Sequence, residues 1–275
     1  MIEDSELSTS SRRMAAPPVE AVRRALKILR CFSVDRPELG ISDIARELGM
    51  HKSTVHRLLI TFEMEGFLHR VNGARYALSW TLFELGSAVP ALQGIRSAVM
   101  RSLESLVDAT GETAHLSVLE GGEVLYVEKV ESANQLRMPS AVGRRVPVHC
   151  TALGKVLLAG LDDGDVARLL GKATLSRFTA NTITDSAALM DEVRRVREKG
   201  FAVDREEIEE GLMCVAGPIV DEMDGTCAAI SIAGPASRVQ VRLEDNITTI
   251  KSIAASLSRD LGANARSLKE ACRPS

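Results

Sequence analysis

The sequence predicts an α/β protein in two parts: an N-terminal winged helix-turn-helix, then a larger mixed α/β domain with a largely antiparallel sheet. Its 275 residues are long for one domain and comfortable for two. Before residue 79, apolar residues recur first at helical spacing and then in alternation around an Asn-Gly pair. From residue 113 onward, alternating segments are interspersed with helical ones, which is typical of a mixed α/β domain.

The expected boundaries follow from these changes of pattern. The first residues are polar and rich in Ser and Arg, which is typical of a disordered tail. We expect a tail over residues 1–18, a winged helix-turn-helix over 19–79, a linker helix over 80–98, a second domain over 99–262 and a C-terminal tail over 263–275.

Three helices are predicted in the first domain. Val22, Leu26, Leu29 and Phe32 have the spacing of one helical face and predict a helix over residues 19–32. A connection over residues 35–40 leads to a short second helix, with Ser42 as its N-cap and Gly49 as its left-handed end. A third helix follows and ends near Gly66, with a buried stripe formed by Val55, Leu58, Leu59 and Phe62.

A β-hairpin is predicted directly after the third helix. Apolar and polar residues alternate over residues 67–78, and Asn72-Gly73 lies in the middle of that run. Both residues tolerate the positive φ that a type I′ turn requires. Three helices and a hairpin in this order predict a winged helix-turn-helix.

The second domain is predicted from its own sequence of elements. We expect helices at 80–88 and 91–110, broken at Pro90, and the period changes to two from Thr113 onward. Strands are expected at 115–119, 124–130, 201–203, 213–220 and 226–233, and helices at 152–160, 163–170, 189–199 and 239–261.

The charge distribution and the third helix point to DNA. Residues 12–75 carry 12 Lys and Arg against 7 Asp and Glu, while the rest of the chain is acidic. Polar side chains at the start of the third helix lie off its buried stripe and have the lengths that reach phosphates and base edges. A polar helix face alone is more often merely solvated, but here a positioning helix and a wing flank it. The predicted DNA contacts are Ser42, Lys52, Ser53, Thr54, His56, Arg57, Arg70, Asn72 and Arg75.

Other features exclude several classes of protein. The five cysteines are widely spaced and form no CxxC, so we expect neither a disulfide framework nor a metal site. No stretch approaches the ~20 apolar residues of a membrane span. The N-terminal residues do not resemble a secretory signal, so we expect a cytoplasmic protein with no cofactor.

A second candidate site lies at a helix start in the larger domain. Thr151 is predicted to be an N-cap, which leaves the first amides of the helix that follows it unpaired. Such a helix start favours anions, of which a carboxylate is the commonest among small metabolites. A helix start satisfied by its own cap and water is the alternative interpretation of these residues.

The motifs together resemble the IclR family of transcriptional regulators. The resemblance rests on AVRRALKILRCF, on GISDIARELGMHKSTVHRLLITFEMEGFLHR and YALS, and on RRVPVHCTALGKVLLA and GTCAAISIAGPASR. It implies a repressor or activator that binds a double-stranded DNA operator and forms a homodimer or homotetramer. It also implies a GAF-like effector domain that binds a small organic acid. The positions that correspond to the family's effector pocket are Gln135, Met138, Ala152, Leu153, Asp204, Glu210, Leu212, Cys214 and Ser231.

One departure and one alternative remain. Where the family pattern places a second serine two residues after Ser231, this chain has Ala233. The alternative function is a thiol enzyme, or a small-molecule-binding enzyme, with a helical N-terminal appendage, because Cys150 follows His149. Adjacent residues of an extended strand point to opposite faces, so His149 is poorly placed to activate this thiol. We therefore expect no enzyme and no catalytic residue.

Overall fold

The structure is a computed structural model, and it describes residues 18–89, 95–134, 140–171, 174–223 and 225–270. The chain divides into two compact units, residues 1–82 and 83–275. The predicted disordered tail lies outside the described residues, apart from Pro18. Each unit is considered by itself.

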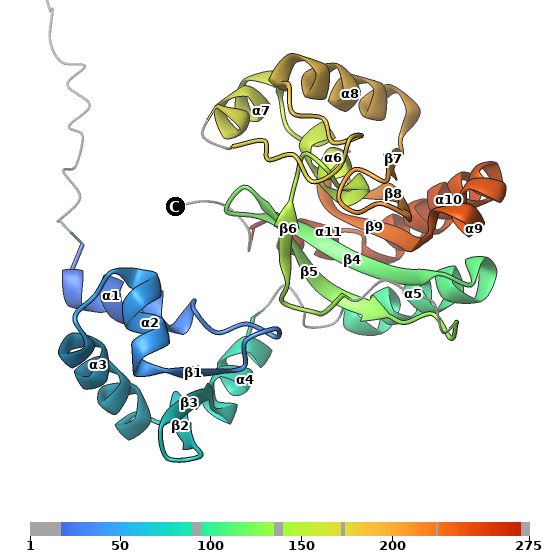
Figure 1. Cartoon of the computed structure of the whole chain (residues 1–275). Coiled ribbons are helices and arrows are strands. Elements are labelled where there is room, and N and C mark those ends of the chain that lie inside the picture. Colours follow the sequence, from blue (N-terminus) through green and yellow to red (C-terminus); the bar gives the residue numbers. More distant parts are fainter. Residues whose placement is uncertain (1–17, 90–94, 135–139, 172–173, 224, 271–275) are drawn as a thin grey trace, which may run out of the picture. The chain divides into compact units, whose positions relative to one another are not determined.

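The first unit holds three helices and a small antiparallel sheet of strand order β1-β3-β2 (Figure 1). Ile28, Leu59 and Tyr76 are among its fully buried side chains, so one core joins the first helix, the third helix and the sheet. The elements are α1 (Glu20–Leu29), β1 (Glu38–Gly40), α2 (Ile41–Leu48), α3 (Lys52–Met64), β2 (Leu68–Val71) and β3 (Arg75–Leu78), followed by α4 (Trp80–Ser87) across the boundary of the unit.

The start of α2 differs from the prediction. The N-cap is Gly40. The backbone N of Gly40 donates a hydrogen bond to the Oδ2 of Asp43 at 3.2 Å. Ser42 therefore lies inside the first turn, exposed, and its prediction as the N-cap is wrong. The aspartate one position further on takes the capping role because its longer side chain reaches back to the orphan amide. The predicted end is confirmed, since Gly49 has φ 62°.

The first helix is shorter than predicted and faces another way. Ile28, Cys31 and Phe32 are buried, whereas Val22 and Leu26 of the predicted stripe are 55% and 53% exposed. The third helix keeps its predicted stripe, with Val55 and Leu59 fully buried in the core.

The wing has the predicted turn residues but a longer connection. Asn72 and Gly73 both have positive φ, at 50° and 75°. The pairing of Val71 with Arg75 leaves three residues in the turn, rather than the two that a simple type I′ hairpin has. β1, which pairs with β3 on its other side, lies in the segment predicted to be a connection.

The second unit is built on a six-stranded sheet of order β6-β5-β4-β9-β8-β7, in which every neighbouring pair is antiparallel. The strands are β4 (Thr113–Glu120), β5 (Glu123–Val130), β6 (Arg145–Pro147), β7 (Ala202–Arg205), β8 (Leu212–Val220) and β9 (Thr226–Pro235). The helices are α5 (Arg96–Thr110), α6 (Ala152–Ala159), α7 (Asp163–Leu170), α8 (Ser186–Lys199), α9 (Ala236–Val241), α10 (Leu243–Leu261) and α11 (Asn264–Glu270).

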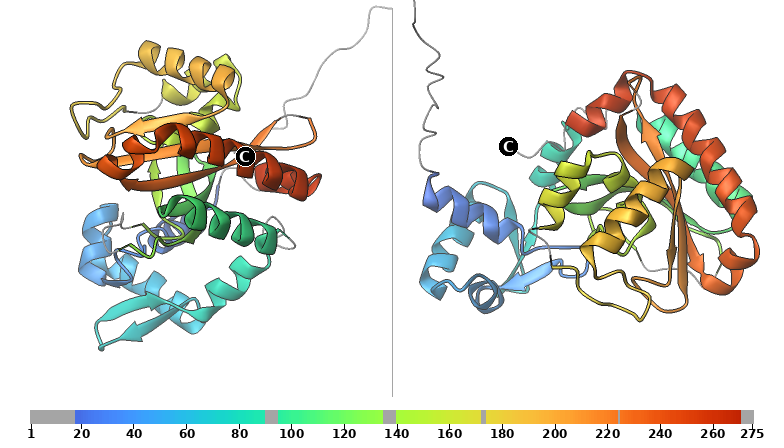
Figure 2. Two further views of the ribbon diagram at one scale, coloured as in Figure 1. Left: turned by 90° about the vertical axis from the view of Figure 1, so that its right-hand side faces the viewer. Right: turned by 90° about the horizontal axis from the view of Figure 1, so that it is seen from above.

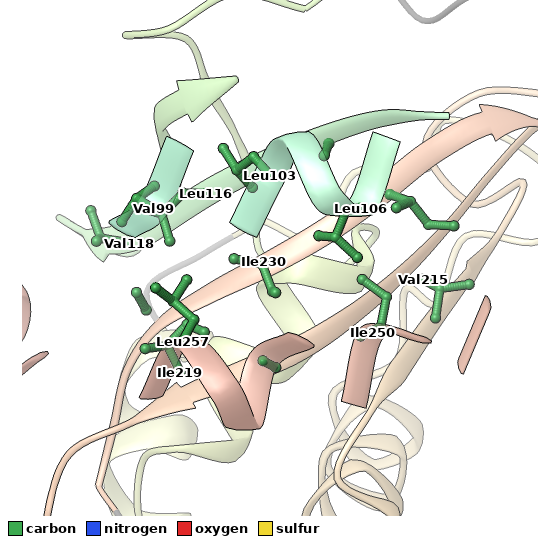
Figure 3. Packing of buried hydrophobic residues seen from close by; sticks show 14 of the residues in the cluster. Val99, Leu103, Leu106, Leu116, Val118, Val215, Ile219, Ile230, Ile250 and Leu257 are labelled. Atoms are coloured by element: carbon green, nitrogen blue, oxygen red, sulfur yellow. The ribbon is translucent and has the colours of Figure 1, made fainter. Parts of the chain in front are cut away.

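Helices cover both faces of this sheet. α5 and α10 lie on one face and α6, α7 and α8 on the other (Figures 1 and 2). On the first face, Leu103 of α5 and Ile250 of α10 meet strand residues such as Leu116 and Ile230 (Figure 3). Since strand residues alternate between faces, the neighbours of Leu116 along β4 face α6 instead. The predicted mixed α/β domain with an antiparallel sheet is thereby confirmed.

Several element bounds differ from the prediction. The predicted closing helix is two helices, because the chain breaks at Arg242, whose φ and ψ are −110° and 24°. β6 was not predicted, and α11 occupies part of the segment expected to be a tail. The segment 90–94, where a helix was predicted to begin, lies outside the described residues, and α5 begins at Arg96.

Candidate DNA-binding face and ligand site

The candidate DNA-binding face is the first part of α3. Lys52, Ser53, His56 and Arg57 are exposed, while Thr54 is half-buried. The N-cap residue His51 makes no side-chain cap bond, so the first amides of α3 remain available to an outside acceptor. Val55 and Leu59 anchor the opposite side of the helix in the core. The core therefore holds α3 with its polar side chains turned outward.

The wing contributes arginines that already have partners in the protein. Arg70 pairs with Glu63 at 3.0 Å and lies over the ring of Tyr76, 5.4 Å from its centroid. Arg75 donates to the carbonyl oxygen of Glu38 at 2.7 Å. These bonds hold the hairpin against α3 and β1, and a contact with DNA would compete with them. Asn72 at the tip is exposed.

The second site begins at the N-terminus of α6. The Oγ1 of Thr151 accepts from the amide of Gly154 at 3.1 Å and donates to the carbonyl oxygen of Pro147 at 2.9 Å, which confirms the predicted cap. The amides of Ala152 and Leu153 precede that of Lys155, which is the first to donate along the helix, to the carbonyl oxygen of Thr151, and both residues are buried. Gly154 is required there, because a Cβ on it would lie 2.1 Å from the carbonyl oxygen of Val148.

The sheet face that α6 covers carries the predicted polar residues. In the register of the sheet, Asp204 on β7 is opposite Cys214 on β8, and Cys214 is opposite Ala233 on β9. Ser231, two residues before Ala233, is opposite His115 on β4. Asp204, Cys214 and Ser231 were all predicted to be site residues. This register brings the three together on one surface below α6.

Three buried polar atoms on this surface have no hydrogen-bond partner in the described part of the chain. They are Nδ1 of His115, Oγ of Ser117 and Oδ2 of Asp204. His115 stacks on Tyr126 with ring centroids 4.8 Å apart, and its Nε2 is 2.7 Å from the Oγ of Ser140. An unsatisfied buried polar group costs about 1–3 kcal/mol, so a cluster of them needs an explanation. A bound polar ligand supplies one.

Burial also changes the charge of these groups. Burial, with the charge of the Glu207 carboxylate, raises the pKa of Asp204 to about 7, although the hydrogen bond from the Glu207 backbone and the charge of Lys155 act in the opposite direction. Burial, with Lys129 as a second cause, lowers the pKa of His115 to about 3, so this histidine is neutral at physiological pH. This surface below α6 thus holds a neutral imidazole and a carboxyl group that is close to half-protonated near neutral pH.

A buried ion pair connects α6 to the loop that follows β7. The Nζ of Lys155 donates to the carboxylate of Glu207 and to the carbonyl oxygen of Val203, the latter at 3.2 Å. The backbone N of Glu207 in turn donates to Oδ1 of Asp204 at 2.8 Å. The remaining oxygen of Glu207, Oε2, has no partner among the described residues and belongs to a side chain that lines a pocket of about 620 Å³ beside β7.

The structure separates some predicted residues from this cluster. Glu210 is exposed, and the buried carboxylate of its segment is that of Glu207. Leu212 is buried at the start of β8. Gln135 and Met138 lie outside the described residues. His115 and Glu207 were missed; the only sequence signal for His115 was a polar residue in an otherwise apolar strand.

The thiols do not have the properties of catalytic nucleophiles. Burial, aided by the charge of Asp204, raises the pKa of Cys150 to about 12. The same two causes raise the pKa of Cys214. His149 interacts with the carbonyl oxygen of Ser176 at 2.9 Å rather than with either thiol. Both thiols are therefore protonated at neutral pH, and the enzyme alternative is not supported.

Two further searches cover only the described residues. Among them, no group of three or more His, Cys, Asp or Glu side chains is arranged to hold a metal ion. None of the helices within those same residues is long and apolar enough to cross a membrane.

A winged helix-turn-helix joined to an α/β domain with a helix-capped polar site defines a ligand-responsive, DNA-binding type of regulator. Two family models match the chain: the IclR helix-turn-helix domain over residues 21–72, and the bacterial transcriptional regulator IclR C-terminal domain over residues 88–259. The chain belongs to the IclR family of bacterial transcriptional regulators.

Individual relatives and solved structures also support membership of the IclR family. The chain is 37% identical over 248 residues to the HTH-type transcriptional regulator XynR of Escherichia coli, covering 90% of this chain and 98% of that protein. An IclR-type regulator from Silicibacter sp. matches with a TM-score of 0.78 and 31% identity, covering 92% and 98% of the two chains. An IclR homologue from Microbacterium hydrocarbonoxydans, complexed with 4-hydroxybenzoate, matches with a TM-score of 0.77 and 28% identity, covering 88% and 98%.

Proposed function

We propose that this regulator binds its operator through the first two turns of α3, with the wing contacting the adjacent backbone. The exposed row of Lys52, Ser53, His56 and Arg57 on a helix anchored in the core carries this proposal. Lys52 and the helix start suit phosphates, whereas Arg57 lies far enough along the helix to reach a base edge. Ser42 and Thr54 would add contacts at the margin.

Replacing Arg57 by Ala should weaken operator binding by about 1–3 kcal/mol and leave the melting temperature unchanged, because the side chain is exposed. Lys52→Ala should weaken binding to specific and nonspecific DNA alike and reduce its salt dependence. Gel-shift titration at moderate salt, with DNA that flanks the protein's own coding region, measures both. Arg168→Ala, an exposed arginine of α7, is the control. Unchanged affinity in both α3 variants would contradict this placement.

We further propose that a small organic acid is the effector and that it binds at the start of α6. The unpartnered Oδ2 of Asp204 and the buried first turn of α6 support this assignment. The carboxylate would accept from the amides of Ala152 and Leu153, where the helix dipole also favours negative charge. Ser231 and Cys214 would contact the rest of the molecule. The related protein complexed with 4-hydroxybenzoate shows that a fold of this type accommodates an acid.

A thermal-shift screen of organic acids, followed by calorimetry, tests the effector site. Asp204→Asn and Ser231→Ala should each weaken binding of a hit by about 1–2 kcal/mol, since each removes a hydrogen bond made in a buried site. Glu210→Gln changes an exposed carboxylate of the same segment and serves as the matched control. If no acid binds, or if the hit binds both site variants as tightly as the parent, the site is elsewhere.

We propose a homodimer, which can pair into a tetramer, as the operator-binding form. One α3 helix covers only a few base pairs, so two half-sites require two copies. Val22 and Leu26 form an exposed apolar face on α1, and Leu85 on α4 is 54% exposed. Such faces are typical of surfaces that a partner covers. We also propose that the protein acts in the cytoplasm and catalyses no reaction.

Light scattering should show a dimer or larger assembly at micromolar concentration. Val22→Asp combined with Leu26→Glu should shift the population toward monomer, because charges would be buried at the proposed interface. Met64→Glu changes an apolar residue that is 80% exposed on α3 and should leave the assembly unaffected. A parent protein that is monomeric at this concentration would overturn the proposal.

A further inference from the structure

The pocket of about 620 Å³ beside β7 is separate from the start of α6. It is lined by residues of β7, of α8 and of the first turns of α10, two helices that lie on opposite faces of the sheet (Figures 1 and 2). Its volume is in the range of small-molecule sites, about 300–1,000 Å³. None of the proposed effector contacts Ala152, Leu153, Asp204, Cys214 and Ser231 lines it.

Side chains of the protein already bond to the main chain of β7 at this pocket. The carbonyl oxygen of Val203 accepts from Lys155 at 3.2 Å. The carbonyl oxygen of Arg205 accepts from Nδ2 of Asn181 at 3.1 Å, and its backbone N donates to Oε1 of Glu207 at 3.4 Å. An added β-strand needs free main-chain groups of this kind, so the pocket suits a small molecule better than an extended peptide.

The buried acidic group of this pocket is Glu207, which is 5% exposed. Its Oε1 accepts from Lys155, whereas Oε2 has no hydrogen-bond partner among the described residues. Asp204, which accepts from the backbone N of Glu207, forms no ion pair within those residues, so two adjacent carboxyl groups share one lysine. A carboxylate oxygen only accepts, so the missing partner is a donor, and a cationic donor also balances the negative charge.

The exposed residues of the pocket carry more positive than negative charge. Arg195 is paired with Glu192 at 2.7 Å. Lys199 makes no ion pair within the described part of the chain, Arg205 donates to a neutral side-chain amide, and Glu244 is the remaining exposed acid of the lining. With the ion pair set aside, two cations face one carboxylate. An anionic group is therefore favoured at the mouth of the pocket.

The other walls of the pocket are apolar. Val196 of α8 and Leu243 and Ile247 of α10 are buried, and Ile183 and Phe201 are half-buried. Walls of this kind accommodate an aliphatic or aromatic group of a ligand. A molecule that carries an ammonium group, a carboxylate and an apolar side chain matches the three parts of the pocket.

We propose that this pocket binds a free α-amino acid with an apolar side chain. Its ammonium group donates to Oε2 of Glu207, while Oε1 keeps the bond from Lys155, and its carboxylate is held by Lys199 and Arg205. The amino acid is a second small-molecule ligand, independent of the acid proposed for the start of α6.

Calorimetry on the full-length chain with leucine and with phenylalanine tests the proposal. The tighter of the two is then displaced by analogues that lack one charged group; for leucine these are 4-methylpentanoate and 3-methylbutylamine, and for phenylalanine 3-phenylpropionate and 2-phenylethylamine. Each analogue should displace the amino acid only at a concentration at least about tenfold higher, because one charge-assisted hydrogen bond is lost. If an analogue competes as well as the amino acid itself, or if neither amino acid binds, the proposal is wrong.

Substitutions in the pocket provide the second readout. Glu207→Gln keeps an oxygen for Lys155 but removes the charge that the ammonium group needs, so it should weaken the amino acid at least about tenfold. Lys199→Gln combined with Arg205→Gln changes only exposed side chains, and should weaken it about tenfold in a protein whose melting temperature is unchanged. Unchanged affinity in this double variant would overturn the proposal, whether or not Glu207→Gln folds.

Two control variants separate this site from the proposed effector site. Arg168→Gln changes an exposed arginine of α7 outside the pocket and should leave the affinity for the amino acid unaltered. Ser231→Ala, which should weaken an acid bound at the start of α6, should also leave it unaltered. An amino acid whose affinity falls in Ser231→Ala and not in the Lys199 and Arg205 double variant binds at the start of α6, and the pocket beside β7 is then not its site.

Discussion

Replacing Lys155 by Met should destabilise the second unit by about 3–5 kcal/mol. The side chain of Lys155 is 1% exposed and that of its partner Glu207 is 7% exposed. Met has nearly the same length as Lys, so the packing changes little, but the carboxylate of Glu207 loses the only ion-pair partner that it has among the described residues. A charge left buried without its counter-ion bears the full desolvation cost.

The comparison of single and double variants separates charge from packing. Lys155→Met combined with Glu207→Gln removes both charges and should recover about 1–2 kcal/mol, since a neutral amide costs less to bury than a carboxylate. Arg168→Met breaks the exposed ion pair with Asp165 and should cost less than about 1 kcal/mol. Chemical denaturation monitored by circular dichroism measures the free energy of unfolding of these three variants and of the parent protein. A loss for Lys155→Met no larger than that for Arg168→Met would show that the buried pair is energetically neutral.

This ion pair was not predicted, and the reason is physical. Lys155 occupies a position in α6 that helical periodicity alone assigns to neither face, and Glu207 lies 52 residues later in a loop. A charged residue is expected at the surface unless its partner is known. The partner is brought into reach only by the crossover from α6 through α8 to β7, which has no local sequence signature.

The elements with strong local signals were predicted well. The caps Gly49 and Thr151 and the turn residues Asn72 and Gly73 have the conformations that their types favour, because each is determined by its own backbone and immediate neighbours. The prediction of Ser42 as the N-cap residue was wrong because Asp43, one residue away, is equally suited by residue type to bond the end of the helix. Short β1 and β6 were missed because three residues are too few to show alternation.

The candidate ligand site was predicted in part for the same reason. The residues on β7, β8 and β9 came from the family resemblance, and the sheet register brings them together. His115 is near Ser231 only because β4 pairs with β9, and these two paired residues are 116 positions apart in the sequence. Long-range pairing of this kind cannot be deduced from period-two alternation within one strand.

Replacing Gly154 by Ala should destabilise the second unit by about 3 kcal/mol or more and abolish binding at the α6 N-terminus. The added Cβ would lie 2.1 Å from the carbonyl oxygen of Val148 and 2.4 Å from its Cα, so the backbone before α6 has to move. A flexible side chain could rotate away, whereas a backbone segment held by β6 and by the Thr151 cap cannot. The displacement would also move the amides of Ala152 and Leu153 away from the position that we propose for the effector carboxylate.

We expect the loss of stability because Gly154 lies against the backbone of Val148, and not because a glycine in a helix is replaced. Gly86→Ala in α4 meets nothing within 4 Å and should be neutral or slightly stabilising, because alanine is the better helix former. Thermal unfolding of both variants gives the stability difference, and calorimetry with an acid that binds the parent gives the ligand effect. Because the second measurement needs a folded protein, it is made well below the melting temperature of the variant. A Gly154→Ala protein that is as stable as Gly86→Ala and still binds the acid would show that α6 is not held as close to Val148 as the structure places it.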